Sequence, residues 1–184
     1  MSRPELLGSF CDVGRDMFVA GLVTSHGGNL SVCSEGRIMI TRRGSMLGRL
    51  RADDLIETGI DVGQDDDLCS RELVVHRSIY AATGARAIAH AHPVHTIARS
   101  LVSDWIVPED SEGRFVLGNV PVVSAAETIA SPEAGRLLAE ALVDHPVAVL
   151  KSHGPFAIGA TLEEAFYHVS ALEASAQVLD LLGK

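Results

Sequence analysis

Two histidines stand two residues apart in His90-Ala91-His92, directly before Pro93. The apolar segment 85–92 predicts a buried strand, in which residues two apart point to the same face. Pro93 lacks the N–H of the sheet ladder and tends to end the strand, which leaves both imidazoles at its rim. Paired imidazoles are common zinc ligands, so the segment predicts part of a metal site. The alternative is a chance pairing, because eight histidines are spread over the chain.

His153 is the natural third ligand, since it follows a predicted buried strand at 147–150 and precedes the turn residues Gly154-Pro155. Three histidines leave tetrahedral zinc with an open position, which is the arrangement that catalytic sites keep. His95 ranks below His153, because it lies beyond Pro93 at the predicted start of a helix. The remaining histidines are further alternatives: His26, His76, His145 and His168.

Glu72 is the leading candidate for a group that approaches the open position. It lies in the predicted first turn of a helix that begins near Ser70, where an acid can be aimed into a cleft and a metal can keep it ionised. The alternative is a favourable interaction of its charge with the helix dipole alone. The residue types do not separate these two interpretations.

Several segments offer donors to an anion. The turn Gly27-Gly28-Asn29 presents backbone N–H groups that no Cβ obstructs. Hydroxyl and guanidinium groups are added by two short segments, which comprise Thr41, Arg42, Arg43 and Gly44 in the first and Ser70 and Arg71 in the second. A hairpin turn and solvated loops are the alternatives.

The elements that must position these residues alternate irregularly along the chain. Apolar spacing, turn residues and helix caps predict helices over residues 4–20, 72–83, 96–101, 132–143 and 162–182, and strands over 30–33, 37–41, 85–92, 120–123 and 147–150, with irregular chain over 61–68 and 104–118. We expect an α/β sandwich in which helices cover a mixed sheet.

Length and composition favour one globular domain over residues 1–184. The net charge of −9 argues against nucleic-acid and membrane partners, so any phosphate must be bound locally. The three cysteines form no close pair, which argues against a disulfide framework and a thiolate metal site. Because no segment looks like a membrane span or a secretory signal, we expect a soluble cytoplasmic protein.

Five motifs in order give the chain a family resemblance: Gly-Gly-Asn-Leu-Ser, Thr-x-x-Gly, Ser-x-Glu, His-Ala-His-Pro-Val-His and His-Gly. The set resembles the class II aldolase/adducin family, and the resemblance runs from Gly21 to the last predicted helix. It implies a three-layer sandwich around a mostly antiparallel sheet. It also implies homotetramers with active sites between subunits.

The resemblance assigns roles to the candidate residues. It implies that zinc, or another divalent metal, is bound by His90, His92 and His153, and that Glu72 is the catalytic acid/base. It also implies that the substrate phosphate is surrounded by Gly28, Asn29, Thr41, Gly44 and Ser70, to which we add Arg71 as a substrate-binding candidate.

The expected function is a metal-dependent aldolase. It would cleave a fuculose-1-phosphate-like ketose phosphate into dihydroxyacetone phosphate and an aldehyde through a metal-stabilised enediolate. Two departures bear on this expectation: Arg71 stands where fuculose-phosphate aldolases have a serine, and residues 105–117 lack their tyrosine. The alternatives are an epimerase, a methylthioribulose-1-phosphate dehydratase, a decarboxylase, or a non-catalytic adducin-like module.

Overall fold

A computed structural model of the chain describes residues 3–61 and 63–184, and its central feature is an eight-stranded sheet. The strand order is β3-β2-β1-β4-β8-β7-β6-β5; β6 and β7 pair in parallel, and the other described neighbours pair antiparallel. The strands are β1 (Asn29–Ser34), β2 (Arg37–Thr41), β3 (Leu55–Gly59), β4 (Ala87–His90), β5 (Trp105–Ile106), β6 (Val120–Val123), β7 (Val147–Leu150) and β8 (Gly154–Gly159).

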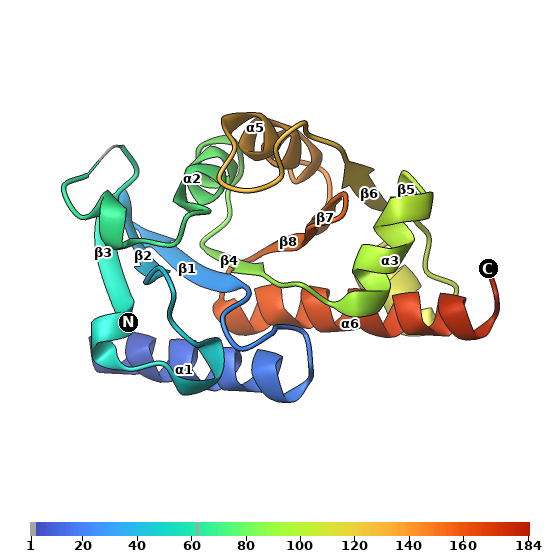
Figure 1. The fold of residues 1–184 in the computed structure, drawn as a ribbon, viewed down its shortest axis with the longest axis horizontal. Coiled ribbons are helices and arrows are strands. Elements are labelled where there is room, and N and C mark those ends of the chain that lie inside the picture. The colour runs from blue at the N-terminus through green and yellow to red at the C-terminus, as the bar shows by residue number, and fades with distance from the viewer. Residues whose placement is uncertain (1–2, 62) are drawn as a thin grey trace.

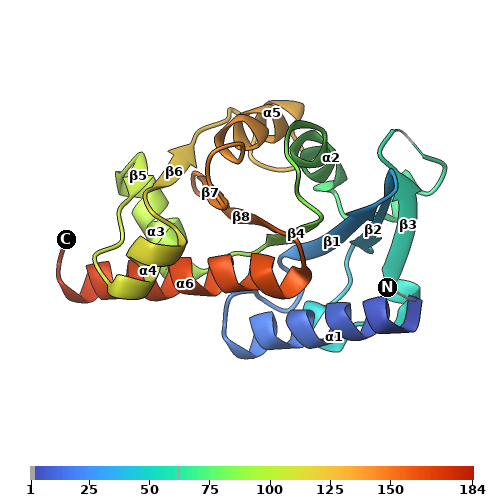
Figure 2. The ribbon, with the colours of Figure 1, turned by 180° about the vertical axis from the view of Figure 1, so that it is seen from behind.

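Helices cover both faces of this sheet (Figure 1, and from behind in Figure 2). α2 and α5 lie on one face, and α1 and α6 lie on the other. Alternate strand residues enter the two cores: Ile88 packs on the side of α2 and α5, whereas Ala87 and Ala89 pack on the side of α1 and α6. The helices are α1 (Arg3–Val19), α2 (Leu73–Ala82), α3 (Val94–Val102), α4 (Ser111–Val116), α5 (Pro132–Ala141) and α6 (Leu162–Leu181). The predicted sandwich with a mixed, mostly antiparallel sheet is confirmed.

Local sequence explains where two of the long helices begin. The Thr161 hydroxyl accepts the N–H of Glu164 at the start of α6, and the Ser131 hydroxyl accepts the N–H of Ala134 at the start of α5. Such caps satisfy N–H groups that have no partner inside the helix. The last helix therefore begins at Leu162, as the sequence predicts.

Two segments differ from the sequence-based expectation. Residues 104–118 were expected to be irregular, yet they contain β5 and α4. The short α4 depends on Asp110, whose carboxylate accepts the N–H of Gly113 and the hydroxyl of Ser175 on α6. Residues after His153 were expected to form a turn, yet they form the central strand β8. Pro155 is tolerated there because it lies beyond His90↔Phe156, the last pair of the ladder between β4 and β8.

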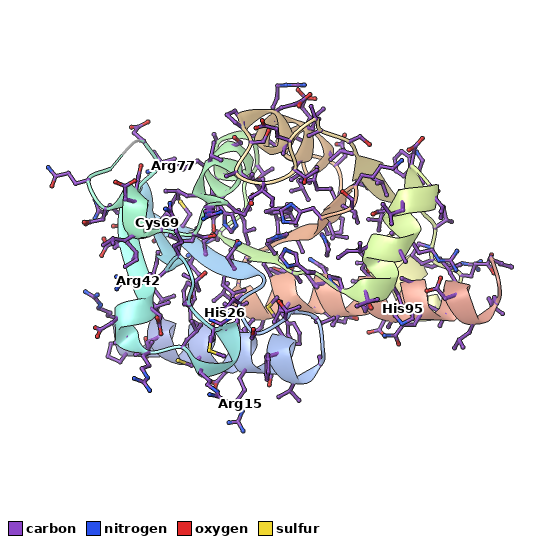
Figure 3. All side chains as sticks on the ribbon, in the orientation of Figure 1. Arg15, His26, Arg42, Cys69, Arg77 and His95 are labelled. Atoms are coloured by element: carbon purple, nitrogen blue, oxygen red, sulfur yellow. The ribbon has the colours of Figure 1, made fainter. Side chains whose placement is uncertain are left out.

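A buried carboxylate on α6 fixes the start of α3, which follows directly after the His-Ala-His segment. Glu173 accepts the backbone N–H groups of His95 and Thr96 at 3.0 and 2.9 Å, and the Thr96 hydroxyl at 2.8 Å. The helix N-terminus supplies the positive end of a dipole that stabilises this charge. His95 and Arg99 of α3 both pair with Asp180 of α6, so two carboxylates of α6 hold α3; His95 is labelled in Figure 3.

The loop between β3 and α2 is held by an ion pair. Arg77 of α2 makes a two-pronged contact with the Asp66 carboxylate, at 2.7 and 2.9 Å, and also donates to the carbonyl of Gly59 (Figure 3). These contacts lower the pKa of Asp66 from 3.8 to about 2.

Within the described ranges, no helix is both long and apolar enough to cross a bilayer.

The first prediction concerns this ion pair. Replacement of Asp66 by Asn should lower the free energy of unfolding by about 1–2 kcal/mol at neutral pH, because Arg77 loses a charged partner that is mostly shielded from solvent. The carboxylate has a lower pKa in the folded chain, so its contribution is present above the unfolded pKa and is lost as the pH falls towards about 2. Urea unfolding at neutral pH and at about pH 3 measures this. If the free energies of unfolding of the variant and the wild type differed by the same amount at both pH values, the stabilising role of the Asp66–Arg77 ion pair would be contradicted.

Candidate active site

The three predicted metal-binding histidines meet at one point of the fold. His90 ends β4, His92 lies two residues beyond it, and His153 lies in the loop between β7 and β8. The Nε2 atom of His90 is 2.9 Å from Nε2 of His92 and 3.2 Å from Nε2 of His153. The strand β4 ends at His90, so His92 reaches its position from outside the sheet rather than from the predicted strand.

Hydrogen bonds on the far side of two rings determine which nitrogen carries the proton. Nδ1 of His90 lies 2.9 Å from the carbonyl of Pro155, and Nδ1 of His153 contacts the carbonyl of Thr128. A carbonyl only accepts, so both Nδ1 atoms donate and both Nε2 atoms present lone pairs. Lone pairs turned towards one another at this distance repel unless a cation lies between them. The donor set therefore fits a divalent metal such as zinc.

Burial keeps these imidazoles neutral, which is the form that binds metal. Desolvation is the main cause that lowers the pKa of each ring: that of His90 lies well below 6.5, that of His92 is about 4, and that of His153 is also lowered. The ring of His90 stacks on Phe156 at 3.9 Å between centroids, which fixes its plane.

Gly154 allows the loop that carries His153 to approach the end of β4. A Cβ at this position would lie 2.1 Å from the carbonyl oxygen of Ala91, and its φ of +146° is one that side chains rarely adopt. The loop is also held by Ser100 of α3, whose hydroxyl accepts the N–H of Ser152 at 3.0 Å. The glycine of the His-Gly motif thus has a steric role.

Glu72 occupies the N-cap position of α2 rather than lying within its first turn, since the helix begins at Leu73, and its side chain makes no capping hydrogen bond. Its side chain is buried, and Oε1 accepts the N–H of Ala130 at 3.0 Å. Oε2 is buried and has no hydrogen-bond partner among the described residues. Burial raises the pKa of this carboxyl. Glu72 is not part of the group of mutually close metal-binding atoms, which comprises the three histidines among the described residues.

One cavity of about 310 Å³ joins the histidines, Glu72 and the predicted anion-binding segments. Its lining also contains Ile129. The remaining lining residues are His26, Gly28, Asn29, Arg42, Arg43, Gly44, Ser45, Ser70 and Arg71. His26 and Arg42 are labelled in Figure 3, on the chain that precedes β1 and on the chain that follows β2. Five of the six predicted substrate-binding residues line this cavity.

Thr41 is the predicted substrate-binding residue that does not line the cavity. It is buried, and its hydroxyl accepts the N–H of Leu30 at 3.2 Å. Gly28 lines the cavity and has a second role: a Cβ there would lie 2.7 Å from the carbonyl of His90, and its φ is +76°. Gly28 therefore allows the turn before β1 to pack closely against the end of β4.

Sequence reasoning missed several residues of the site. Ser45 lies one residue beyond the predicted basic segment, and its proximity to Gly44 was the available signal. Ile129 and Ala130 belong to a segment without a recognisable motif. Ala130 has a φ of +54°, which turns its N–H towards Glu72. Such a contact between residues 58 positions apart leaves no periodic pattern in the sequence.

Other histidines have separate partners. Nδ1 of His168 lies 2.9 Å from the carbonyl of Ile158, and the ring of His145 lies against Trp105. His76 is buried in a network with Asn29, Ser31 and Tyr80.

Comparison with known proteins connects this geometry to enzymes of several activities. The L-fuculose phosphate aldolase of Methanocaldococcus jannaschii is 32% identical over 95% of this chain and 97% of its own. A methylthioribulose-1-phosphate dehydratase of Acidiphilium cryptum is 34% identical over 88% and 83% of the two chains. A 3-oxo-tetronate 4-phosphate decarboxylase of Escherichia coli is 29% identical over 93% and 84%.

A solved structure and a family model agree with these relatives. The crystal structure of L-fuculose-1-phosphate aldolase from Thermus thermophilus superposes with a TM-score of 0.94 and 38% identity, and the match covers 98% of this chain and 95% of that one. The family model described as "Class II Aldolase and Adducin N-terminal domain" matches residues 9–179. The resemblance carried by the five motifs is confirmed, and this chain belongs to the class II aldolase and adducin family.

Proposed function

We propose that this chain is a metal-dependent lyase that cleaves a ketose 1-phosphate of the fuculose type into dihydroxyacetone phosphate and an aldehyde. The observation that carries the proposal is the open group of three imidazoles in the same cavity as a buried carboxylate with a free oxygen. A scaffold without catalytic function would have no use for a buried carboxylate with one unpartnered oxygen, because such a group destabilises the fold. This weighs against a non-catalytic adducin-like module.

His90, His92 and His153 would hold the metal, which we propose to be zinc. A divalent ion there supplies Lewis-acid stabilisation of the negative charge that develops on substrate oxygens as the C–C bond breaks. The carbonyls of Pro155 and Thr128 keep the Nδ1 protons in place, so that the Nε2 atoms stay available as ligands.

Glu72 would carry the proton between solvent and the reacting carbon. The N–H of Ala130 holds Oε1, so Oε2 is the oxygen free to move the proton. Burial raises the pKa of Glu72, which makes its carboxylate a stronger base and leaves more of the acid form present at a given pH than at an exposed glutamate. In the cleavage direction the protonated carboxyl donates, and in the condensation direction the carboxylate accepts.

The phosphate would lie against the wall formed by Gly28, Asn29, Gly44, Ser70 and Arg71, with Arg42 nearby. Guanidinium forks and exposed N–H groups suit a doubly charged monoester. In a chain with a net charge of −9, this local basic wall supports binding of an anion. Thr41 would act indirectly, since its hydroxyl holds the backbone of Leu30 next to Asn29.

A methylthioribulose-1-phosphate dehydratase or a decarboxylase is the second candidate. The sequence identity of 34% to the dehydratase of Acidiphilium cryptum favours the dehydratase. Arg71 in place of a serine favours a substrate with a further anionic group, as a decarboxylase would need. An epimerase would use the same ligands. By family resemblance we also propose a homotetramer with active sites between subunits, and from the sequence we propose a cytoplasmic location.

A product screen separates these activities. The zinc-loaded chain should release dihydroxyacetone phosphate from fuculose 1-phosphate, and this product can be measured by coupled reduction with NADH. Rhamnulose, ribulose and methylthioribulose phosphates and a 3-oxo-acid phosphate are the parallel substrates. Dehydration of methylthioribulose phosphate without release of dihydroxyacetone phosphate from any ketose would replace the aldolase proposal by the dehydratase.

The next prediction concerns metal binding. His153→Ala should lower zinc affinity by more than about 100-fold, because loss of a ligand costs more than loss of a ligand's hydrogen-bond partner. Metal analysis after dialysis against a competing chelator measures this. His145→Ala, which alters a histidine outside the cavity, should retain stoichiometric zinc. Equal zinc content in both variants would remove His153 from the site.

The role of Glu72 has its own test. Glu72→Gln should keep the zinc but lower kcat by about 10²–10⁴-fold, because the amide cannot transfer a proton. Its melting temperature should not fall, because the substitution removes a buried charge that has one hydrogen bond. Glu140→Gln, at an exposed glutamate of α5, is the matched control. Wild-type turnover in Glu72→Gln would dismiss the proposed acid/base.

A further inference from the structure

We propose that His76 is a positioning residue that holds the side-chain amide of Asn29 with its NH₂ group turned into the cavity, as a donor to the anionic group of the substrate. The inference rests on the proposed function, because it concerns the same cavity. It adds a residue that does not line the cavity and that acts through Asn29.

Two elements build the network. β1 supplies Asn29 and Ser31, which are two residues apart and face the same side of the sheet. α2 supplies His76 and Tyr80, which are four residues apart and lie on the same side of the helix. Nε2 of His76 is 2.6 Å from Oδ1 of Asn29, Nδ1 is 2.6 Å from Oγ of Ser31, and that Oγ is 2.7 Å from the hydroxyl of Tyr80.

The imidazole in this network is neutral. His76 is fully buried, and desolvation lowers its pKa to about 3. Its surroundings are the uncharged groups of Asn29 and Ser31 and the ring of Phe156, which it meets edge to face. A neutral imidazole has one donor and one acceptor nitrogen, so the chain of hydrogen bonds must run in one direction.

The hydroxyl of Tyr80 determines that direction. Among the described residues, Ser31 is its hydrogen-bond partner; the thiol of Cys33 interacts with Tyr80 electrostatically but forms no hydrogen bond with it. If Asn29 donated to His76, Nδ1–H of His76 would donate to Ser31, and the buried hydrogen of either Ser31 or Tyr80 would be left without an acceptor, which is unfavourable. In the opposite direction Tyr80 donates to Ser31, Ser31 donates to Nδ1 of His76, and Nε2–H of His76 donates to Oδ1 of Asn29. Every hydrogen then has an acceptor.

This direction fixes what Asn29 offers to the cavity. Its carbonyl oxygen is occupied by His76, so the amide NH₂ remains, and that group has no hydrogen-bond partner among the described residues. Two N–H donors attract a phosphate oxygen, whereas a rotated amide would present a carbonyl oxygen that repels it. The buried network therefore gives a neutral side chain a defined polarity towards an anion.

The substitution test compares two replacements of His76 in the full-length, zinc-loaded chain. His76→Leu removes the donor to Asn29, whereas His76→Gln returns an N–H near the position of Nε2. We expect the Kd for inorganic phosphate, measured by calorimetry, to be about tenfold higher in His76→Leu than in the wild type. In His76→Gln the Kd should lie close to the wild-type value. With a ketose phosphate, KM should follow the same order while kcat changes little. Zinc content should be equal in all variants.

Val75→Ala is the matched control, because it alters a buried residue of the same helix that packs in the apolar core. It should lower the melting temperature and leave phosphate affinity unchanged. A phosphate Kd that rises equally in Val75→Ala and His76→Leu, or one that His76→Gln does not restore, would overturn the inference. So would a wild-type chain that does not bind phosphate.

A measurement on the wild-type chain is independent of any variant. Long-range ¹H–¹⁵N correlation spectra should show His76 with a protonated Nε2 and an unprotonated Nδ1, and the opposite tautomer would overturn the inference. The two proposals fail separately. If no sugar phosphate is turned over but the phosphate Kd responds to His76 as described, the proposed activity is wrong and the role of His76 stands. If turnover is found but the Kd does not respond, the role of His76 is wrong.

Discussion

The structure depends on one electrostatic constraint: the Nε2 lone pairs of His90 and His153 face each other at 3.2 Å, and Nε2 of His92 lies 2.9 Å from that of His90. Neutral rings do not hold such an arrangement by mutual attraction. It persists because the carbonyls of Pro155 and Thr128 bind the opposite nitrogens and Phe156 stacks on His90. The fold therefore holds the three rings in the geometry that a bound cation needs before any cation binds.

The surrounding elements bring separate chain segments to this point. Gly28 and Gly154 allow two backbones to approach the end of β4 more closely than any side chain permits. Glu173 of α6 fixes the start of α3, and Ser100 of α3 then holds the loop that carries His153. The long C-terminal helix thus supports the site without lining the cavity.

In the function that we propose, one cavity serves both anion binding and acid/base chemistry. Among the described residues, Glu72 keeps one oxygen without a hydrogen-bond partner in the cavity that the histidines also line, and burial raises its pKa. In the same cavity a neutral chain of hydrogen bonds through His76 would orient Asn29. A neutral donor near a phosphate adds affinity without another charge that would need to be desolvated.

The sequence by itself determined the sandwich, most of its strands and helices, and the histidine motifs, because periodicity, caps and glycine turns are local signals. It did not determine α4, which depends on the contact of Asp110 with Ser175, or β8, whose pairing with β4 outweighs the turn signal of its proline. Only the tertiary structure decided that Thr41 lies outside the cavity and that Ala130 holds Glu72. Such contacts join residues far apart in sequence, and their geometry is set by the packing of helices on the sheet.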